Sequence, residues 1–457
     1  MSNSANSANI SKAARRLPPM FGNGLPFLGH LRPFNADPIR LLVAGRAQHC
    51  DAFFIKLLGK RIAVLTGPEA NEAVFRAPEE TLSPREAYRL MTPIFGRGIA
   101  YDAEPRIMAE QLGFLYPAVR DDRLRTYTQQ MAEETIQSLA TWGESGELEL
   151  VEFCTELTMF IASRCLLGHE FRQHLTGEFA KLYQDMERSL IPIAYFFPNL
   201  PLPVFRRRNQ ARLRMVEVIT DIVAARHADG VRGEDFLQTL MEARYQDGRE
   251  LTEHEITGLL LTIVFAGHHT TATLAAWTFV ELLRSPEHLA AILEEQARVL
   301  GEDSSVTFTN LKLLVYLERF IMEVERLHPP IIVMMRKAIQ DFHFRNWRIP
   351  RNSFVMVSPA VSNRDASLFR NADQFDPSRF APGRDEHRKH PFGITTFGGG
   401  MHRCIGQHFA YLQIKTVVSV MLRRYHMELV SGGTSPSYEF MVVPPSSPCI
   451  VRYERRA

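Results

Sequence analysis

The feature that most constrains the fold is a run from residue 252 to residue 285 that contains no proline. Thr252 and Glu255 have the spacing of a capping box, so we expect a helix to begin there. Ser285 and Pro286 end it. At 1.5 Å per residue, such a helix is about 50 Å long and must cross the whole molecule. Apolar residues occupy both faces of its middle, which predicts that the helix is buried.

Helical patterns also extend from residue 103 to about residue 241, and over residues 311–328, where Pro329 ends the second one. The first pattern is interrupted at residues 191–205, which are rich in proline and aromatic residues. This break is either a mobile lid over an apolar pocket or an ordinary connection between helices. Strands are predicted at residues 53–58, 61–66, 342–344, 347–349 and 354–357, the first two as a hairpin.

The composition is that of an ordinary globular protein, with 45% hydrophobic and 23% charged residues. The net charge is only +2 and the sequence carries no nucleic-acid-binding motif, so we expect no nucleic-acid partner. The five cysteines are scattered and odd in number, without a CxxC pair. They therefore predict a reducing environment, and we expect the protein to be cytoplasmic.

Residues 1–15 are polar and are expected to form a disordered tail. The N-terminus contains neither an apolar signal core nor a span of about 20 apolar residues, so no transmembrane segment is expected. No repeat or linker divides residues 16–457. We expect these residues to form a single domain that is mainly α with a minor β portion.

A glycine-rich loop at residues 397–406, FGGGMHRCIG, presents Cys404 just before an apolar helical run. The sulfur therefore lies near a helix N-terminus, where the helix dipole and free N–H groups favour thiolate over thiol. Glycines let the backbone approach a flat, bulky group closely. A thiolate presented in this way suits an axial ligand of haem iron. A lone cysteine without such a setting is usually a small buried apolar residue.

This loop resembles the cysteine-ligand loop of the cytochromes P-450, in which a phenylalanine and a glycine precede the cysteine and a second glycine follows it. The resemblance implies the mainly α haem-thiolate fold and a haem b cofactor. It also implies that Cys404 is the axial iron ligand, and that Phe397 and Gly406 shape the cofactor-binding loop.

The same family pairs a Glu-x-x-Arg motif with a later arginine, here Glu323, Arg326 and Arg379. The resemblance implies that these three residues form a buried structural cluster on the proximal side of the haem, where two guanidinium groups satisfy one carboxylate. Taken alone, Glu323 and Arg326 would be an ordinary pair one turn apart on a helix surface.

The long helix carries residues 266–271, AGHHTT, which match the oxygen-activation stretch of the family. Gly267 would leave room against the haem, and Thr270 would place a hydroxyl beside bound dioxygen. A threonine in a buried helix also commonly bonds back to a carbonyl one turn earlier. Most of the family has Asp or Glu at the position of His269, which is here either a satisfied core residue or a proton carrier.

Gly-His-His-Thr and residues 88–102 resemble the sterol 14α-demethylases within the cytochromes P-450. Residues 88–102 contain the signature of that group, a Tyr followed by Pro-x-Phe-Gly-x-Gly and then Asp. The resemblance implies that Tyr88, Arg336 and His402 hold the haem propionates. Apolar residues in register with these motifs are expected to line the substrate pocket: Leu90, Met91, Phe95, Ala266, Ile331, Ile332, Val333, Met441 and Val442.

One segment departs from the sterol 14α-demethylases. Ile107 and Met108 stand where that group usually brings a basic residue to a haem propionate. Either Arg106, which is displaced by one position, makes this contact, or the contact is missing.

The function predicted from the resemblance is a soluble monooxygenase that removes the 14α-methyl group of a sterol with O2. Alternatives are hydroxylation of another steroid, terpenoid or fatty acid, and a non-catalytic haem-binding sensor. The sequence contains no flavin, NAD or ferredoxin motif, so electrons are expected from a ferredoxin or flavodoxin-type donor with its reductase. Basic residues that form either a docking face for this donor or a solvated surface are Arg120, Arg123, Arg125, Arg384, Arg388, Lys389 and Arg403.

Overall fold

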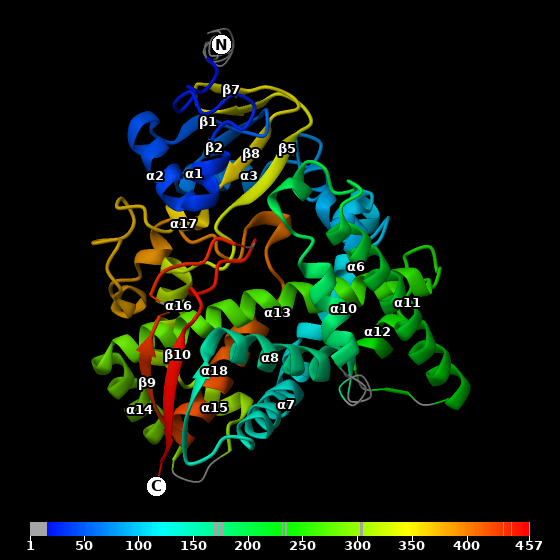
Figure 1. Ribbon diagram of the computed structural model, residues 1–457, viewed down its shortest axis with the longest axis vertical. Coiled ribbons are helices and arrows are strands. Elements are labelled where there is room, and N and C mark those ends of the chain that lie inside the picture. Colours follow the sequence, from blue (N-terminus) through cyan, green and yellow to red (C-terminus); the bar gives the residue numbers. More distant parts are fainter. Residues whose placement is uncertain are drawn as a thin grey trace, which may run out of the picture.

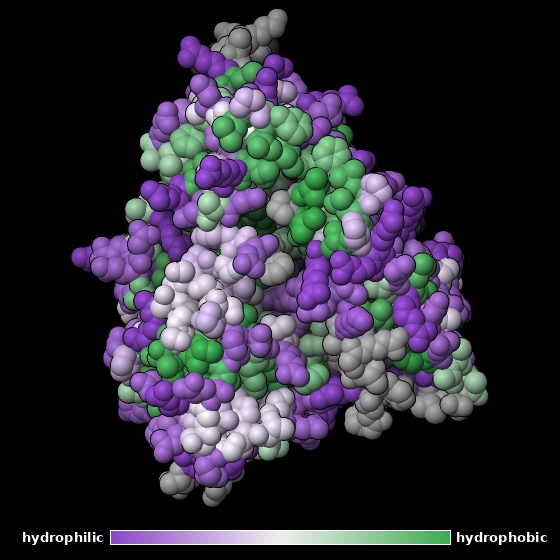
Figure 2. All heavy atoms as spheres, in the orientation of Figure 1, coloured by the Kyte–Doolittle hydropathy of each residue, from purple (hydrophilic) through white to green (hydrophobic). Residues whose placement is uncertain are grey.

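The computed structural model describes residues 16–168, 172, 177–230, 232–233, 235–301, 305–432, 434–439 and 441–456. The tail predicted at residues 1–15 lies outside this part. Figure 1 shows a large body of helices with a smaller β-rich lobe at one end. On the face drawn in Figure 2, apolar side chains gather over the β-rich lobe, whereas hydrophilic side chains cover much of the helical body.

Helix α13, Glu253–Arg284, crosses the middle of the helical body (Figure 1). It has 32 residues and begins with a complete capping box between Thr252 and Glu255, which confirms the helix predicted from the sequence. Residues 271–282 are all buried. The helix is long and apolar enough to cross a membrane, but 72% of its apolar window is buried inside the protein, as in a core helix.

Other long helices surround α13, and α8, α11, α16 and α18 pack directly against it. The longer helices are α2 (Pro38–His49), α3 (Pro68–Phe75), α6 (Pro105–Leu115), α7 (Asp121–Leu139), α8 (Leu150–Ala162), α10 (Gly177–Glu187), α11 (Pro203–Asp229), α14 (Pro286–Leu300), α16 (Val315–Leu327) and α18 (Gln407–Arg424). The shorter helices and turns are α1 (Leu31–Ala36), α4 (Pro84–Ala87), η1 (Arg89–Met91), α5 (Thr92–Phe95), η2 (Ala100–Asp102), η3 (Tyr116–Val119), η4 (Ser163–Leu167), η5 (Pro192–Tyr195), α12 (Phe236–Glu242), α15 (Phe308–Lys312), α17 (Pro359–Ser362), η6 (Pro377–Phe380), η7 (Glu386–Lys389) and η8 (Gly400–His402).

The single helix predicted over residues 311–328 is two helices, α15 and α16, separated at Leu313 and Leu314. The physical reason lies in another helix. The buried carboxylate of Glu295, on α14, accepts hydrogen bonds from the backbone N–H groups of Tyr316 and Leu317 at 2.7 and 3.0 Å. It therefore caps the start of α16, where the free N–H groups of a new helix need acceptors.

The β-rich lobe is built on a five-stranded sheet of order β1-β2-β8-β5-β3. Its strands are β1 (Ala52–Leu57), β2 (Lys60–Leu65), β3 (Leu82–Ser83), β5 (Met334–Ala338) and β8 (Phe354–Val357). Strands β1 and β2 form the predicted hairpin, and β2 pairs with β8 in parallel. Because side chains alternate along a strand, Phe54 and Leu65 pack on one face of the sheet and Phe53 and Val64 on the other.

Two smaller sheets complete the fold. The pair β6 (Phe342–Phe344) and β7 (Trp347–Ile349) lies where the sequence predicts strands. The three-stranded sheet β4-β10-β9, with strands Ser145–Glu149, Ile450–Arg455 and Tyr425–Ser431, is not predicted. Strand β4, SGELE, has no β-branched or aromatic residue, so it forms because distant strands pair with it and not because of its own propensity.

Candidate active site

Cys404 lies in the loop between η8 and α18, and its backbone N–H donates to the carbonyl of Phe397 at 2.9 Å. Gly406 is the N-cap residue of α18. Backbone N–H groups of Gly406 and Gln407, together with Arg403, lower the pKa of the Cys404 thiol, but burial among protein atoms is the larger effect and raises it. Cys404 is exposed as a residue. The protein therefore offers a thiol near a helix N-terminus, on a residue that solvent reaches.

The shape of this loop requires Gly400. Its φ of +63° belongs to the left-handed region, and a Cβ there would lie 2.1 Å from the carbonyl oxygen of Phe75. Helix α3, which ends at Phe75, thus packs directly against the loop. A larger residue at this position would force the loop away from α3.

A buried cation without a carboxylate partner faces the same site. Arg336, on β5, is 6% exposed, and its guanidinium donates to the carbonyl of Met335 at 2.9 Å. It forms no ion pair within the described part of the chain. Burying such a charge is costly unless an anion compensates it. Arg336 therefore fits the acidic side chains of a haem.

Two stacked tyrosines lie beside Arg336. The rings of Tyr88 and Tyr101 are 4.9 Å apart, and the Tyr88 hydroxyl accepts from the backbone N–H of Met335 at 3.3 Å. Burial raises the pKa of Tyr101 to about 12; the charges of Tyr88 and Cys404 add to this rise, and the charge of Arg336 opposes it. Tyr101 is thus close enough to both Arg336 and Cys404 to sense their charges. Sequence reasoning missed Tyr101, although it stands beside Asp102 at the end of the 88–102 signature.

The remaining residues considered for the propionates lie differently. His402 places its Nε2 atom 3.0 Å from Oε1 of Glu79, so the structure pairs this imidazole with a carboxylate. Arg106 is 77% exposed and lies 3.5 Å from Glu110 on its own helix.

Opposite this region, α13 presents an open face. Ala266 is exposed and Gly267 and Thr270 are half-buried, in the middle of a helix that is otherwise mostly buried. A Cβ added at Gly267 would meet no atom within 4 Å. The Thr270 hydroxyl donates to the carbonyl of Ala266 at 2.7 Å, the back-bond expected of a helical threonine. Its oxygen keeps acceptor capacity for a group bound beside the helix.

The two histidines of α13 have different surroundings. His268 is buried, with its Nε2 2.8 Å from the carbonyl of Thr155, and burial, helped by the charge of His269, lowers its pKa well below the ordinary value. His269 places Nε2 3.2 Å from Nδ1 of His268 and 2.9 Å from Oε1 of Glu187, on α10. The Glu187 side chain is 28% exposed. His268 is thus a satisfied core residue, whereas His269 connects the helix interior to a carboxylate that reaches solvent.

Glu323, Arg326 and Arg379 are brought together with no exposure to solvent. Nε of Arg326 lies 2.7 Å from Oε2 of Glu323, and Nε of Arg379 lies 2.9 Å from Oε1. Both guanidinium groups also donate to main-chain carbonyls between residues 363 and 374. Arg379 also pairs with Glu386 at 3.1 Å. Two carboxylates and several carbonyls therefore satisfy the two buried cations and tie α16 to the segment before the cysteine loop.

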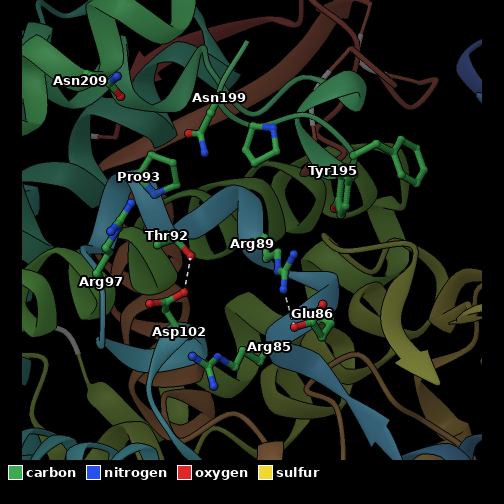
Figure 3. A pocket seen from close by; sticks show the side chains of 12 residues that line it. Arg85, Glu86, Arg89, Thr92, Pro93, Arg97, Asp102, Tyr195, Asn199 and Asn209 are labelled. Atoms are coloured by element: carbon green, nitrogen blue, oxygen red, sulfur yellow. Dashed lines mark hydrogen bonds and ion pairs between the residues drawn. The ribbon is translucent and has the colours of Figure 1, made fainter. Parts of the chain in front are cut away.

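A pocket of about 740 Å³ lies between residues 85–102 and the proline-rich break at residues 191–205 (Figure 3). Figure 3 shows Arg89 directed at Glu86, a pair 2.6 Å apart, and Thr92 bonded to Asp102 at 3.1 Å. The lining combines arginines, carboxylates, amides and aromatic rings: Arg85, Glu86, Arg89, Thr92, Pro93, Arg97, Asp102, Tyr195, Phe196, Pro198, Asn199 and Asn209. The break therefore forms one wall of a pocket whose lining is both polar and apolar.

The apolar residues predicted to line a substrate pocket lie on several elements. Leu90, Met91, Phe95 and Ile332 are buried, whereas Ile331, Val333, Met441 and Val442 are half-buried. The C-terminal segment is held in place by Val443, whose carbonyl accepts from Trp277 of α13 at 3.0 Å and whose N–H donates to Pro330 at 2.9 Å. Residues 441–443 are thus fixed between α13 and the segment that begins at Pro330.

The chain is similar to known proteins over nearly its whole length. The family model described as cytochrome P450 matches residues 18–452. The obtusifoliol 14-alpha demethylase of Triticum aestivum is 38% identical over 446 residues, which are 96% of this chain and 98% of that protein. The sterol 14alpha-demethylase of Mycobacterium tuberculosis is 38% identical over 434 residues, which are 94% and 96% of the two chains.

The fold is shared with a solved structure, retinoic acid-bound cyanobacterial CYP120A1. The TM-score is 0.85 at 24% identity, over 97% of this chain and 100% of that one. The family match, the relatives and the fold lead to one conclusion. The chain belongs to the cytochrome P450 family, whose monooxygenases use haem with an axial cysteine thiolate.

Proposed function

We propose that the protein removes the 14α-methyl group of a sterol by successive oxidations with O2. Relatives named for 14α-demethylation of sterols, at 38% identity, support this substrate. The observation that carries the proposal is the packing of the signature at residues 88–102 against α13. The Phe95 ring lies 5.9 Å from the Phe265 ring, and a Cβ at Gly258 would lie 2.4 Å from the carbonyl of Phe95. The signature thus lies along α13. Its contact residue there, Phe265, directly precedes Ala266, which is on the open face of the helix.

In this proposal Cys404 is the axial iron ligand, and Phe397 and Gly406 hold its loop. Arg336, with the hydroxyls of Tyr88 and Tyr101, would bind the haem propionates through charge-assisted hydrogen bonds. When bound there, the haem supplies the activation of dioxygen. The propionate role of His402 stays a prediction, since its ring faces Glu79. Glu323, Arg326 and Arg379 would keep the proximal side rigid.

The residues of α13 would leave space for the substrate and transfer protons. Gly267 leaves space beside the helix for the substrate. Thr270 would hold a proton at Oγ1 beside the bound oxygen, turning from its bond to the Ala266 carbonyl. Glu187 and His269 would pass protons from solvent to the interior, because an imidazole both accepts and donates near neutral pH.

The substrate would be held mainly by apolar burial. The nine residues that the sequence assigns to the pocket would enclose a long, rigid body. Burial contributes about 25 cal/mol per Å², so a sterol needs few hydrogen bonds to bind well. The lining would consist of Leu90, Met91, Phe95, Ala266, Ile331, Ile332, Val333, Met441 and Val442.

We further propose that the electron donor is a cytoplasmic ferredoxin or flavodoxin-type protein with its reductase, and that residues 16–457 act as one domain. The basic residues differ in whether a carboxylate of the same chain already compensates their charge. Arg384 pairs with Asp376 and Glu386 at 2.6 and 2.5 Å, so its charge is largely compensated. Arg120 and Arg403 are exposed and form no ion pair among the described residues, which favours them over Arg384 as docking contacts.

The pocket of about 740 Å³, which has arginines in its lining, favours a second candidate, the hydroxylation of a fatty acid or another acidic lipid. Arg97 is exposed and forms no ion pair among the residues that the structure describes. A carboxylate could pair with Arg97, and an apolar chain would then extend toward α13.

The test is a titration of the haem-loaded protein with 14α-methyl sterols and with fatty acids, followed through the Soret band. We expect sterols to displace the water on iron and shift the haem to high spin, and fatty acids to leave the spectrum unchanged. A spin shift and product with fatty acids alone would reject the sterol proposal in favour of the second candidate.

A further inference from the structure

Glu325, on α16, is a buried acid with an unusual partner. It is 5% exposed and forms no ion pair in the described part of the chain. Its Oε2 accepts a hydrogen bond from the hydroxyl of Tyr411, on α18. Glu323, two residues earlier, is instead neutralised by two arginines. The carboxyl of Glu325 is thus held by a phenol and not by a cation.

Glu325 and Tyr411 contact the residues at the start of the cysteine loop. The Tyr411 ring lies 6.0 Å from the ring of Phe397, whose carbonyl accepts from the backbone N–H of Cys404. The hydroxyl of Thr396, the residue before Phe397, donates to the main-chain carbonyl of Glu325 at 3.1 Å. Contacts from α16 and α18 therefore meet at the start of the loop that holds the thiol.

The charge on Glu325 also affects the pKa of the Cys404 thiol. Burial raises the pKa of Glu325 to about 8, while the Tyr411 hydrogen bond and the charge of Arg403 oppose this rise. A negative charge on Glu325 raises the pKa of the Cys404 thiol. Beyond Tyr411 lies a cavity of about 290 Å³. The charged or titratable groups that line it are Asp121, Lys312, Glu318, His408 and Lys415.

We propose that Glu325 and Tyr411 are positioning residues for the thiolate ligand. Their hydrogen bond supports the cysteine loop from behind, and the charge state of Glu325 sets how readily the haem iron accepts an electron. The inference rests on Cys404 being the iron ligand, which the absorption band of the reduced carbonyl complex tests separately in the same samples.

The physical reason is electrostatic. A protonated Glu325 adds no charge beside the thiolate, whereas an ionised one adds a second negative charge in a poorly solvated region. That charge stabilises the oxidised iron, so the reduction potential falls when Glu325 ionises. In the pH range where this happens, reduction takes one electron from the donor onto iron and one proton from solvent onto Glu325.

The experiment is a spectroelectrochemical titration of the substrate-free, haem-loaded protein from about pH 6 to about pH 9.5. For the wild type we expect a constant reduction potential at low pH and a falling potential above about pH 7. The Glu325→Gln variant keeps the shape of the side chain but cannot ionise, so its potential should stay constant. The matched control, Glu318→Gln, removes a half-exposed carboxylate from the same helix and should retain the wild-type pH dependence.

A second variant, Tyr411→Phe, removes only the hydroxyl. Because that hydroxyl lowers the pKa of Glu325, its loss should move the bend in the curve to higher pH. The proposal is overturned if the wild-type potential does not vary with pH, or if Glu325→Gln varies as the wild type does. An unchanged bend in Tyr411→Phe would also overturn it, and this variant decides the question if Glu325→Gln does not bind haem.

Discussion

At the scale of single residues, two adjacent histidines on one helix have separate roles because they face different partners. The sequence leaves open whether His269 is a core residue or a proton carrier. The structure gives the core position to His268, which contacts the carbonyl of Thr155, and places His269 against Glu187. Glu187 is 82 positions earlier in the chain, on α10, so no local sequence pattern could have revealed the pair.

A substitution at His269 tests this assignment. His269→Ala should lower the turnover roughly 100-fold, because proton delivery to the site is lost, while the ferric spectrum and the melting temperature stay close to those of the wild type. Glu187→Gln should have the same kind of effect, and Gln184→Ala, an exposed change on the same helix, should have none. Turnover of His269→Ala at the wild-type rate would contradict the proposed role.

A second prediction at this scale concerns Gly400. Gly400→Ala should destabilise the haem-loaded protein by about 1–3 kcal/mol, because the new Cβ meets the Phe75 carbonyl and strains the left-handed backbone. Gly113→Ala, in helix α6 with no atom within 4 Å of the added Cβ, is the matched control and should be neutral or slightly stabilising. The measurement is the free energy of unfolding in urea, together with the haem content after purification. Equal stability of the two variants would count against the packing described here.

A third prediction concerns Glu325 and the pH dependence of stability. Its pKa is raised from 4.5 to about 8 in the folded protein. The folded state therefore holds this proton more tightly, and wild-type stability falls as the pH rises from the unfolded value through the folded one. Relative to wild type, Glu325→Gln should gain stability over that interval, by on the order of a few kcal/mol. Urea denaturation at about pH 5 and about pH 8.5 measures the difference, and a difference independent of pH would refute the buried-acid assignment.

At the scale of elements, the sequence predicts best where a signal is local. The capping box at Thr252 marks the start of α13, and β-branched and aromatic runs mark β6, β7 and β8. Elements that depend on distant partners could not be predicted in the same way. Strand β4 pairs with β10 some 300 residues later, and α16 starts where it does because Glu295 caps it from α14. In both cases the deciding contact is tertiary.

The cap of α16 supplies the prediction at this scale. Glu295→Ala leaves two backbone N–H groups without their acceptor in a buried setting, which should destabilise the protein by about 1–3 kcal/mol. Glu294→Ala changes the exposed neighbour on the same helix and should alter the free energy of unfolding by less than about 0.5 kcal/mol. If both variants unfold at the same urea concentration, the carboxylate of Glu295 does not determine where α16 begins.

At the scale of the whole molecule, helix α13 and the cysteine loop define the two sides of the site, and both are visible in the sequence. The sequence predicts an apolar pocket beside the proline-rich break, whereas the pocket found there also carries arginines, carboxylates and amides. These side chains come from two segments far apart in the chain, so no local sequence pattern reveals how they combine.

The most direct test of sterol 14α-demethylation is the fate of the methyl carbon. The haem-loaded protein is incubated with O2, a surrogate ferredoxin and reductase, and a sterol that carries an isotopic label in its 14α-methyl group. The proposed function predicts labelled formate and the demethylated sterol in equal amounts, and neither product from Cys404→Ser. Release of a hydroxylated sterol that retains the labelled methyl group, without formate, would contradict it.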